Sequence, residues 1–304
     1  MGEWESNRCR RCFNIVPDGP KCPICGATRD DFLPPSERHN LFARLSFYSS
    51  VVASLQWDAQ AIDLGPDARA WQDMPNERRQ RLTRLLAGFC VAEDAVAEHL
   101  RPFGDATDDT LLAWVLFLQR RDEVRHAEFF DRVGAEVLGL AGASAAERRA
   151  AARELTTPAI LDLFETELPA MAGELAASRL QLEDGVSLYH MVIEGIVLSS
   201  AQQALLEDLE DGAMPGVSDG VHRVSLDERW HIGLGLRCLI EAQPSPDKIQ
   251  ELMGKVHEAS EAWGDAVPQP IRDHVTQLTA RRMSVSGLGG YADPELDPLQ
   301  GLVS

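Results

Sequence analysis

The sequence of 304 residues has few basic side chains and no long apolar run. Its 29 lysines and arginines stand against 48 aspartates and glutamates, and the formal net charge of −19 argues against a nucleic-acid or anionic-membrane partner. No apolar run reaches the ~20 residues that a membrane span needs, and the N-terminal segment lacks the apolar stretch of a signal peptide. We therefore expect a soluble, cytoplasmic protein without a membrane span.

Strand-like alternation is also missing between residues 37 and 282, where apolar residues recur at steps of three and four. The sequence therefore predicts an all-α domain with turns at glycine and proline residues, among them Gly139 and Gly185. The expected units are residues 1–35, a small cysteine module; 36–283, a helical domain; and 284–304, a flexible tail. The expected helices are 37–57, 76–101, 107–139, 158–183, 185–211, 217–241, 246–264 and 271–282.

Four of the six cysteines lie together near the N-terminus, as two CxxC pairs. Two such pairs at short spacing typically form a tetrahedral four-thiolate metal site. In a reducing compartment clustered cysteines indicate metal binding more often than disulfides. The predicted ligands of one iron or zinc ion are Cys9, Cys12, Cys22 and Cys25.

Two Glu-x-x-His pairs stand on predicted helices. Glu123 and His126 form the first pair, and Glu228 and His231 form the second. A step of three residues keeps both side chains on one face of a helix, so that they can bind the same ion. One such pair can be a solvated, salt-bridging face, but two pairs among apolar residues favour a metal centre.

An aspartate precedes the glutamate in each pair, giving Asp122 and Asp227. Carboxylates behind a ligating histidine often fix the orientation of its ring. We expect this supporting role for both aspartates.

A dinuclear site in a four-helix bundle takes one further carboxylate from each of two other helices. Glu194 lies in a segment that is apolar all round and must be buried, so it needs a cation or a proton. The alternative candidates for this ligand are Glu165 and Glu167, which lie in a more polar segment. On the first helix Glu93 shares the apolar stripe, and its neighbours Asp94 and Glu98 are the alternatives.

Six candidate ligands result, in two matched halves. A ligand set rich in carboxylates suits iron or manganese, and such a centre can activate dioxygen. The candidates are Glu93, Glu123, His126, Glu194, Glu228 and His231.

The order E…DExxH…E…DExxH resembles the ribonucleotide reductase small subunit, and more narrowly the small-subunit-like ligand-binding oxidases. The likeness rests on LAGFCVAEDAV at 86–96, DEVRHAEFF at 122–130, YHMVIEG at 189–195 and DERWHIGLG at 227–235. It implies a ferritin-like four-helix bundle with extra helices, a manganese/iron or di-iron centre, and a bound long-chain fatty acid or similar amphiphile. We also expect a homodimer, an external reductase as electron donor and a lipid-like substrate.

Those oxidases form an ether crosslink between a valine three residues after the first ligand and a tyrosine five residues before the fourth. Val96 and Tyr189 occupy these positions, so the resemblance implies the crosslink here. The chain departs from the pattern at Gln202, where the oxidases carry a tyrosine near the centre.

Three other functions stay open: a reductase small subunit with a manganese/iron cofactor, a rubrerythrin-like peroxide reductase and a metal-storage protein. A reductase small subunit that stores a tyrosyl radical is excluded, because Phe130 stands where that tyrosine would be. The second cysteine pair, in KCPICGA, resembles the rubredoxin-like module of rubrerythrins, which implies electron transfer to the centre. Phe13 departs from that pattern, since a glycine normally follows Cys12.

Overall fold

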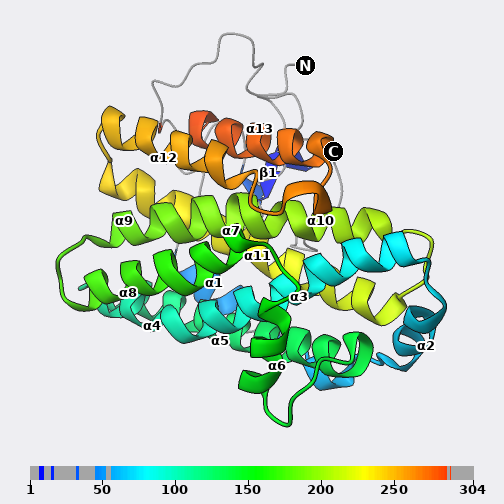
Figure 1. The fold of residues 1–304 in the computed structure, drawn as a ribbon. Helices are drawn as coiled ribbons and strands as arrows, with labels where there is room; N and C mark the ends of the chain where they lie inside the picture. The colour runs from blue at the N-terminus through cyan, green and yellow to red at the C-terminus, as the bar shows by residue number, and fades with distance from the viewer. Residues whose placement is uncertain are drawn as a thin grey trace.

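The computed structural model describes residues 7–9, 15–16, 32–33, 45–52, 56–285 and 288. From residue 45 onward these residues form a helical bundle (Figure 1), so the predicted all-α class is confirmed. The helices are α1 (Leu45–Val52), η4 (Ala59–Ala61), α2 (Gly65–Asp73), α3 (Asn76–His99), α4 (Arg101–Asp105), α5 (Thr110–Val133), η5 (Gly134–Leu138), α6 (Ala145–Arg153), α7 (Pro158–Asp162), η6 (Leu163–Glu167), α8 (Leu168–Ala176), α9 (Leu182–Val186), η7 (Ser187–Leu198), α10 (Ser199–Asp208), α11 (Pro215–Ala242), α12 (Pro246–Ala259), η8 (Gly264–Ala266) and α13 (Gln269–Val285).

Four long helical segments form the centre of the bundle. α3 packs along α5, and α11 packs along both η7 and α10. α9, η7 and α10 follow one another without a break, with a π-helical middle. α12 and α13 lie together along one side of this centre (Figure 1). Each central segment therefore turns one face toward the same interior.

Helix α11 begins where a buried carboxylate caps it. Asp67 of α2 is fully buried and accepts hydrogen bonds from the backbone N–H groups of Gly216 and Val217, at 3.1 and 2.7 Å. Pro215, at the start of the helix, has no N–H to satisfy. This cap sets the position of α11 relative to α2.

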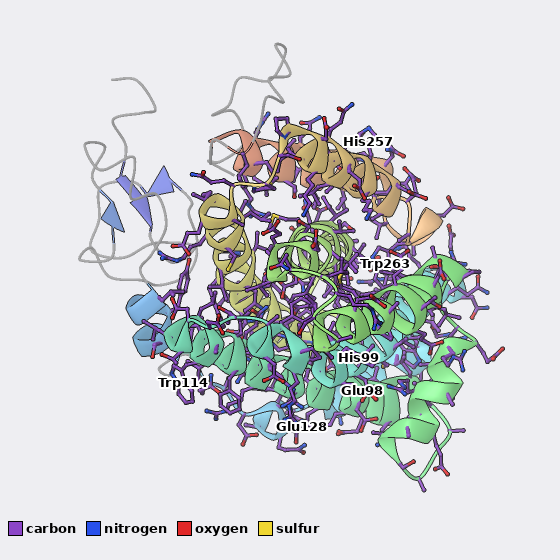
Figure 2. The ribbon with its side chains drawn as sticks, turned by 90° about the vertical axis from the view of Figure 1, so that its left-hand side faces the viewer. Glu98, His99, Trp114, Glu128, His257 and Trp263 are labelled. Carbon is purple, nitrogen blue, oxygen red and sulfur yellow. The ribbon has the colours of Figure 1, made fainter. Side chains whose placement is uncertain are left out.

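Trp263, labelled in Figure 2, packs closely against α3. Its indole N–H donates to the carbonyl of Val197 at 2.7 Å, and its ring stacks on Phe89. A Cβ built on Gly88 would lie 2.2 Å from the ring. The glycine therefore permits the close approach of the indole to the helix.

Several predicted boundaries are wrong. Gly185 lies inside α9, and the turn comes earlier, where Ser178 has a φ of 54°. The expected turn at Gly139 is confirmed by its φ of 67°. Of the helix expected at 37–57, the structure describes Leu45–Val52 as helical and Gln56 and Trp57 as non-helical. The sequence did not predict α2 and α6. α2 is short and polar, and its place depends on the distant contact of Asp67.

Three short strands lie within the predicted cysteine module: β1 (Asn7–Cys9), β2 (Ile15–Val16) and β3 (Phe32–Leu33). They form an antiparallel sheet with the order β2-β1-β3. The predicted four-cysteine site lies outside the described residues. Of its four cysteines the structure describes only Cys9, and of Cys9 only the backbone. Nearly all of the predicted tail lies outside them as well. No described helix is long and apolar enough to span a membrane.

Candidate metal centre

Six side chains from four helical segments meet inside the bundle. None of them is more than 1% exposed. Their donor atoms form two overlapping groups, and within each group the atoms lie within 4.8 Å of one another. The six come from α3 (Glu93), α5 (Glu123 and His126), η7 (Glu194) and α11 (Glu228 and His231).

Two of the carboxylates belong to both groups. Glu123 places Oε2 3.1 Å from Nδ1 of His126 and Oε1 3.0 Å from Nδ1 of His231. Glu228 places Oε1 3.8 Å from Nδ1 of His126 and Oε2 3.1 Å from Nδ1 of His231. Each carboxylate thus offers one oxygen to each side, which is the geometry of a bridging ligand.

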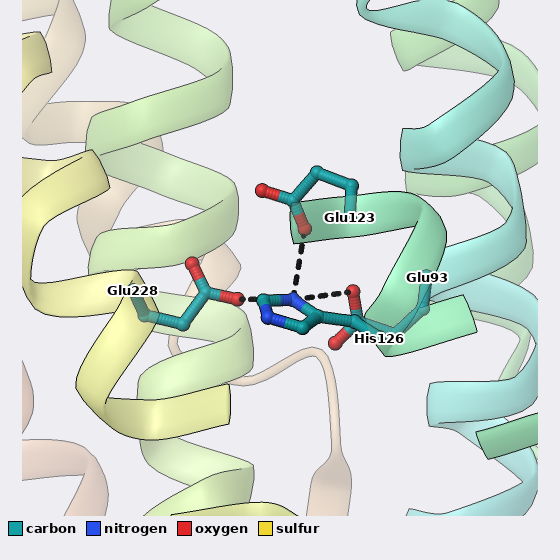
Figure 3. A group of neighbouring side chains, drawn as sticks. All are labelled: Glu93, Glu123, His126 and Glu228. Carbon is teal, nitrogen blue, oxygen red and sulfur yellow. Dashed lines mark hydrogen bonds and ion pairs between the residues drawn. The ribbon is translucent and has the colours of Figure 1, made fainter. Parts of the chain in front are cut away.

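The other two glutamates belong to one group each. Glu93 lies 3.8 Å from Nδ1 of His126, with Glu123 and Glu228 completing the group (Figure 3). Glu194 lies 3.0 Å from Nδ1 of His231 on the other side. Two half-sites of three carboxylates and one imidazole therefore share their two central carboxylates.

The carboxylates weighed as alternatives to Glu93 and Glu194 lie outside the cluster. Glu167 is exposed, and Glu165 pairs with Arg153 at 2.9 Å. Asp94 is half-buried and Glu98 is exposed, and both lie near Arg149. Of the carboxylates weighed for these two positions, the structure brings Glu93 and Glu194 into the cluster.

Burial and crowding shift the pKa values of the cluster. Burial, together with neighbouring carboxylates, raises the pKa of Glu93 and of Glu194 well above 4.5. Burial alone would lower the pKa of His126 and of His231, but the surrounding carboxylates, Glu123 foremost, raise it well above 6.5. Both imidazoles hold the pKa of Glu123 below its usual value in spite of burial. The cluster therefore binds protons strongly unless another cation takes their place.

The cluster fits a pair of cations. Both oxygens of Glu93, Oε2 of Glu194 and Oε1 of Glu228 are buried and have no hydrogen-bond partner. Buried carboxylate oxygens without a donor are costly, and a metal ion satisfies them. Carboxylate-rich donors favour iron or manganese over copper or zinc.

The two predicted supporting aspartates cross over between the motifs. Asp227, next to Glu228, lies 3.2 Å from Nε2 of His126 in the other motif. Asp122 lies 3.7 Å from Nε2 of His231, too far for a direct hydrogen bond. Each aspartate thus lies behind the histidine of the opposite helix, which leaves Nδ1 of each ring facing the carboxylates.

Arg125 joins the two aspartates. It contacts Asp122 at 2.7 Å and Asp227 at 2.9 Å, and it is 7% exposed. Gln56 accepts a hydrogen bond from Arg125 and donates one to Asp122. The indole N–H of Trp57 donates to Asp227 at 2.9 Å, and its ring stacks on His126. Sequence reasoning missed these three residues, and no local pattern marks them.

A second pair of supporting residues was also missed. Gln119 donates to Oε1 of Glu194 at 3.0 Å, and its amide oxygen lies 3.1 Å from Nε2 of His190. Burial lowers the pKa of His190 to about 3, so the ring is neutral and Nε2 donates to Gln119. His190 thus orients the amide that holds Glu194.

The two residues of the predicted crosslink are both fully buried. Val96 lies on α3 one turn after Glu93, and Tyr189 lies on η7 five residues before Glu194. The Tyr189 hydroxyl donates to Oε1 of Glu123 at 2.7 Å. The tyrosine hydroxyl thus contacts the cluster itself. Phe130 stacks on Phe89 with ring centroids 4.6 Å apart.

Fold and cluster together define a helical-bundle protein with a buried carboxylate–histidine centre built on paired Glu-x-x-His helices. The chain belongs to the family "Ribonucleotide reductase, small chain", whose model matches residues 44–284.

Solved structures share the fold. One is an R2-like ligand-binding oxidase from Sulfolobus acidocaldarius, with 21% identity and a TM-score of 0.64 over 80% of this chain and 90% of that chain. Another is a valine-to-leucine mutant of an R2-like ligand-binding oxidase with an anaerobically reconstituted Mn/Fe cofactor, with 19% identity and a TM-score of 0.64 over 80% of this chain and 91% of that chain. At these identities the likeness shows the fold, and it confirms the predicted ferritin-like bundle.

Proposed function

We propose that this protein is an oxidase or oxygenase with a dinuclear metal centre, which activates dioxygen and oxidises an aliphatic or lipid-like substrate by two electrons. The observation that carries the proposal is the pair of half-sites that share two bridging carboxylates. Family membership supports a dinuclear oxidoreductase, and the valine-to-leucine mutant oxidase named above, which has a similar fold, holds an Mn/Fe cofactor.

The six clustered side chains would hold a manganese/iron or di-iron pair. When bound, such a pair supplies electrons to dioxygen, because each ion can change its oxidation state. The protein contributes the geometry: Asp227 and Asp122 support the imidazoles, and Gln119 orients Glu194. The buried surroundings exclude water from the reacting atoms.

The phenylalanine at position 130, where a radical-storing reductase subunit would have a tyrosine, favours an oxidase over such a subunit. The ring of Phe130 lies in an apolar stack with Phe89 and offers no hydroxyl. A reductase small subunit with a manganese/iron cofactor is the second candidate, since the family itself favours it. The four-cysteine module would pass electrons from an external donor to the dinuclear centre. We also propose that the protein binds a long-chain fatty acid and forms a homodimer.

Val96 and Tyr189 offer a covalent test. Formation of the ether would break the Cβ–H bond of Val96 and the O–H bond of Tyr189. Two electrons and two protons would pass to dioxygen as the C–O bond forms. The hydrogen bond from Tyr189 to Glu123 supports a tyrosine oxygen beside the reacting centre.

The experiment loads the full chain anaerobically with manganese and iron, admits air, and measures metal content, absorption and intact mass. We expect an absorption change that depends on dioxygen, and a loss of two hydrogens mapped to the peptides of Val96 and Tyr189. Tyr189→Phe should keep the metals and the absorption change but not the mass loss. An unchanged parent mass with both metals bound would refute the crosslink, and a centre inert to air would refute the oxidase.

A further inference from the structure

A pocket of about 520 Å³ lies between α10, α11 and α13 and extends from the surface to the buried cluster. The bridging carboxylate Glu228 lines it, although this residue is only 1% exposed. Oε1 of Glu228 is buried and has no hydrogen-bond partner. A water molecule takes about 30 Å³ in the liquid, so the pocket has room for a metal ion together with its hydration shell.

Exposure falls step by step along the α11 wall of this pocket. His222 is exposed, Ser225 is 9% exposed and Glu228 is 1% exposed, and all three line the pocket. Residues three apart are neighbours on the surface of a helix, and the three together span roughly 9 Å along its axis at 1.5 Å per residue. This wall therefore leads from the surface to a carboxylate of the cluster.

The α10 wall brings two carboxylates to the outer end of the pocket. Glu207 and Glu210 line the pocket and are exposed. α10 ends at Asp208, α11 begins at Pro215, and the two helices pack together. Packed helices joined by so short a connection run antiparallel, so the end of α10 lies beside the part of α11 that carries His222. We call Glu207, Glu210 and His222 the mouth of the pocket.

The mouth has the donor groups that attract a divalent transition-metal ion. Carboxylates suit manganese, and imidazole suits iron. The lining has three glutamates and two arginines, Arg229 and Arg282, and neither arginine is without a partner. The net charge of −19 also attracts cations to the whole molecule.

The mouth differs from the cluster in how closely its donors approach one another. Among the described residues, the groups that bring three or more such donor atoms within 4.8 Å of one another are the two half-sites of the cluster. An ion at the mouth would therefore be held more weakly than in the cluster. Weak binding at the surface and strong binding inside favour transfer of the ion inward.

We infer that this pocket is the route by which divalent metal ions enter the centre, with Glu207, Glu210 and His222 capturing each ion and Glu228 receiving it from the pocket. The inference rests on the proposed dinuclear centre and adds how that centre is filled. The residues of the mouth change the rates at which ions enter and leave. The affinity of the filled centre depends on the six ligands of the cluster and not on the mouth.

The test follows Mn(II) uptake by the metal-free full chain without air, as the loss of the electron paramagnetic resonance signal of free Mn(II). Manganese is the probe because it prefers oxygen donors to the thiolates of the four cysteines. A variant of the mouth with Glu207→Gln, Glu210→Gln and His222→Gln should take up Mn(II) about tenfold more slowly, the lower end of the gain that a charged cleft gives to association. Release to a chelator should slow by the same factor, and the final manganese content should equal that of the parent.

The matched control removes the same groups from α12, with Glu251→Gln, His257→Gln and Glu258→Gln. All three residues are exposed and lie outside the lining of the pocket. This control changes the net charge equally and should load at nearly the rate of the parent. Loading of the mouth variant at the parent rate, or equal slowing in both variants, would overturn the inference. So would a mouth variant that ends with less manganese than the parent.

A second pair of variants changes the width of the pocket between its mouth and Glu228. Ser225→Leu narrows this part and Ser225→Ala widens it, so Ser225→Leu should load more slowly than Ser225→Ala and reach the same final content. Equal loading rates in the two variants would contradict the route. A parent chain that takes up no manganese pair would refute the proposed centre itself, whereas full loading at equal rates in the parent and the mouth variant would refute the route alone.

Discussion

Each bridging glutamate lies between two imidazole rings, and this position determines the charge balance of the interior. The four clustered glutamates carry four negative charges, and two divalent cations supply four positive charges. Outside this group Arg125 offsets one of the two charges of Asp122 and Asp227. Once the four glutamates have lost their protons, the buried charges come close to balance when two metal ions are present.

Exchange of a single carboxylate by its amide tests this assignment. Glu194→Gln should lower the metal content from two ions to about one per dinuclear centre, because Glu194 belongs only to the half-site of His231. Elemental analysis after loading and desalting measures the ratio against the parent. The matched control is Glu167→Gln, which changes an exposed glutamate outside the cluster and should keep both ions. Equal metal loss in both variants would contradict the assignment.

The six candidate ligands could be predicted because their evidence is local. A three-residue spacing places Glu123 and His126 on one face, and the apolar neighbours of Glu194 require its burial. The supporting residues could not be predicted in this way. Trp57 reaches Asp227 across 170 positions, and His190 reaches Gln119 across 71. Contacts at such separations depend on the packing of whole helices, which no local pattern records.

The distance between the two Glu-x-x-His helices depends on a glycine of α11. A Cβ on Gly220 would lie 2.0 Å from the ring of Phe129, three residues after His126 on α5. Gly220→Ala should therefore push α11 from α5. Overpacking of this kind typically costs about 1–3 kcal/mol of unfolding free energy. Chemical denaturation should show this loss, and the loaded variant should hold fewer ions than the parent.

Gly254 of α12 provides the matched control for this prediction. Nothing lies within 4 Å of a Cβ built on it, and the residue is exposed. Gly254→Ala should raise the unfolding free energy by about 0.5–1 kcal/mol, since alanine is favoured within helices. If both substitutions stabilise the protein, Gly220 does not limit the approach of the two helices.

At the scale of elements the sequence predicts the long central helices well and the short ones poorly. α3, α5 and α11 have sustained apolar periodicity, so that their existence follows from local pattern. α2 is held instead by the cap that Asp67 forms on α11, a contact over 150 positions. Gly185 looks like a helix break, but it lies within α9, where a Cβ would come within 2.7 Å of Leu175 and 2.9 Å of Phe103, so the glycine permits close packing instead of a turn.

At the scale of the whole molecule, protons and metal ions compete for the same interior. In the metal-free protein the pKa values of Glu93, Glu194 and Glu228 lie above 4.5. Between 4.5 and these raised values the folded state holds protons that the unfolded state has lost, so its stability falls as pH rises. The stabilisation from His126 and His231 is complete below 6.5 and is lost as pH rises through their raised pKa values.

The glutamates and the histidines of the cluster both make the folded state less stable as pH rises. The Tm of the metal-free protein should therefore fall as the pH rises from about 5 to about 8. The lowered pKa values of Glu123 and Asp227 act in the opposite direction below about pH 4.5, where the unfolded carboxyls titrate. The pKa of His190, lowered to about 3, also acts in the opposite direction up to about pH 6.5, but the three glutamates with raised pKa values outweigh this single group. Bound metal ions need the deprotonated ligands, so the gain in Tm on loading should grow over the same range.

Scanning calorimetry of loaded and metal-free protein across this range measures both slopes. The Glu194→Gln variant supplies the control, because it keeps the four cysteines and lacks one titrating carboxylate of the cluster. Its metal-free Tm should depend less on pH than that of the parent. A metal-free Tm that is flat or rises with pH in the parent would mean that the cluster does not hold its protons in the folded state. The charge balance that requires two cations would then be wrong as well.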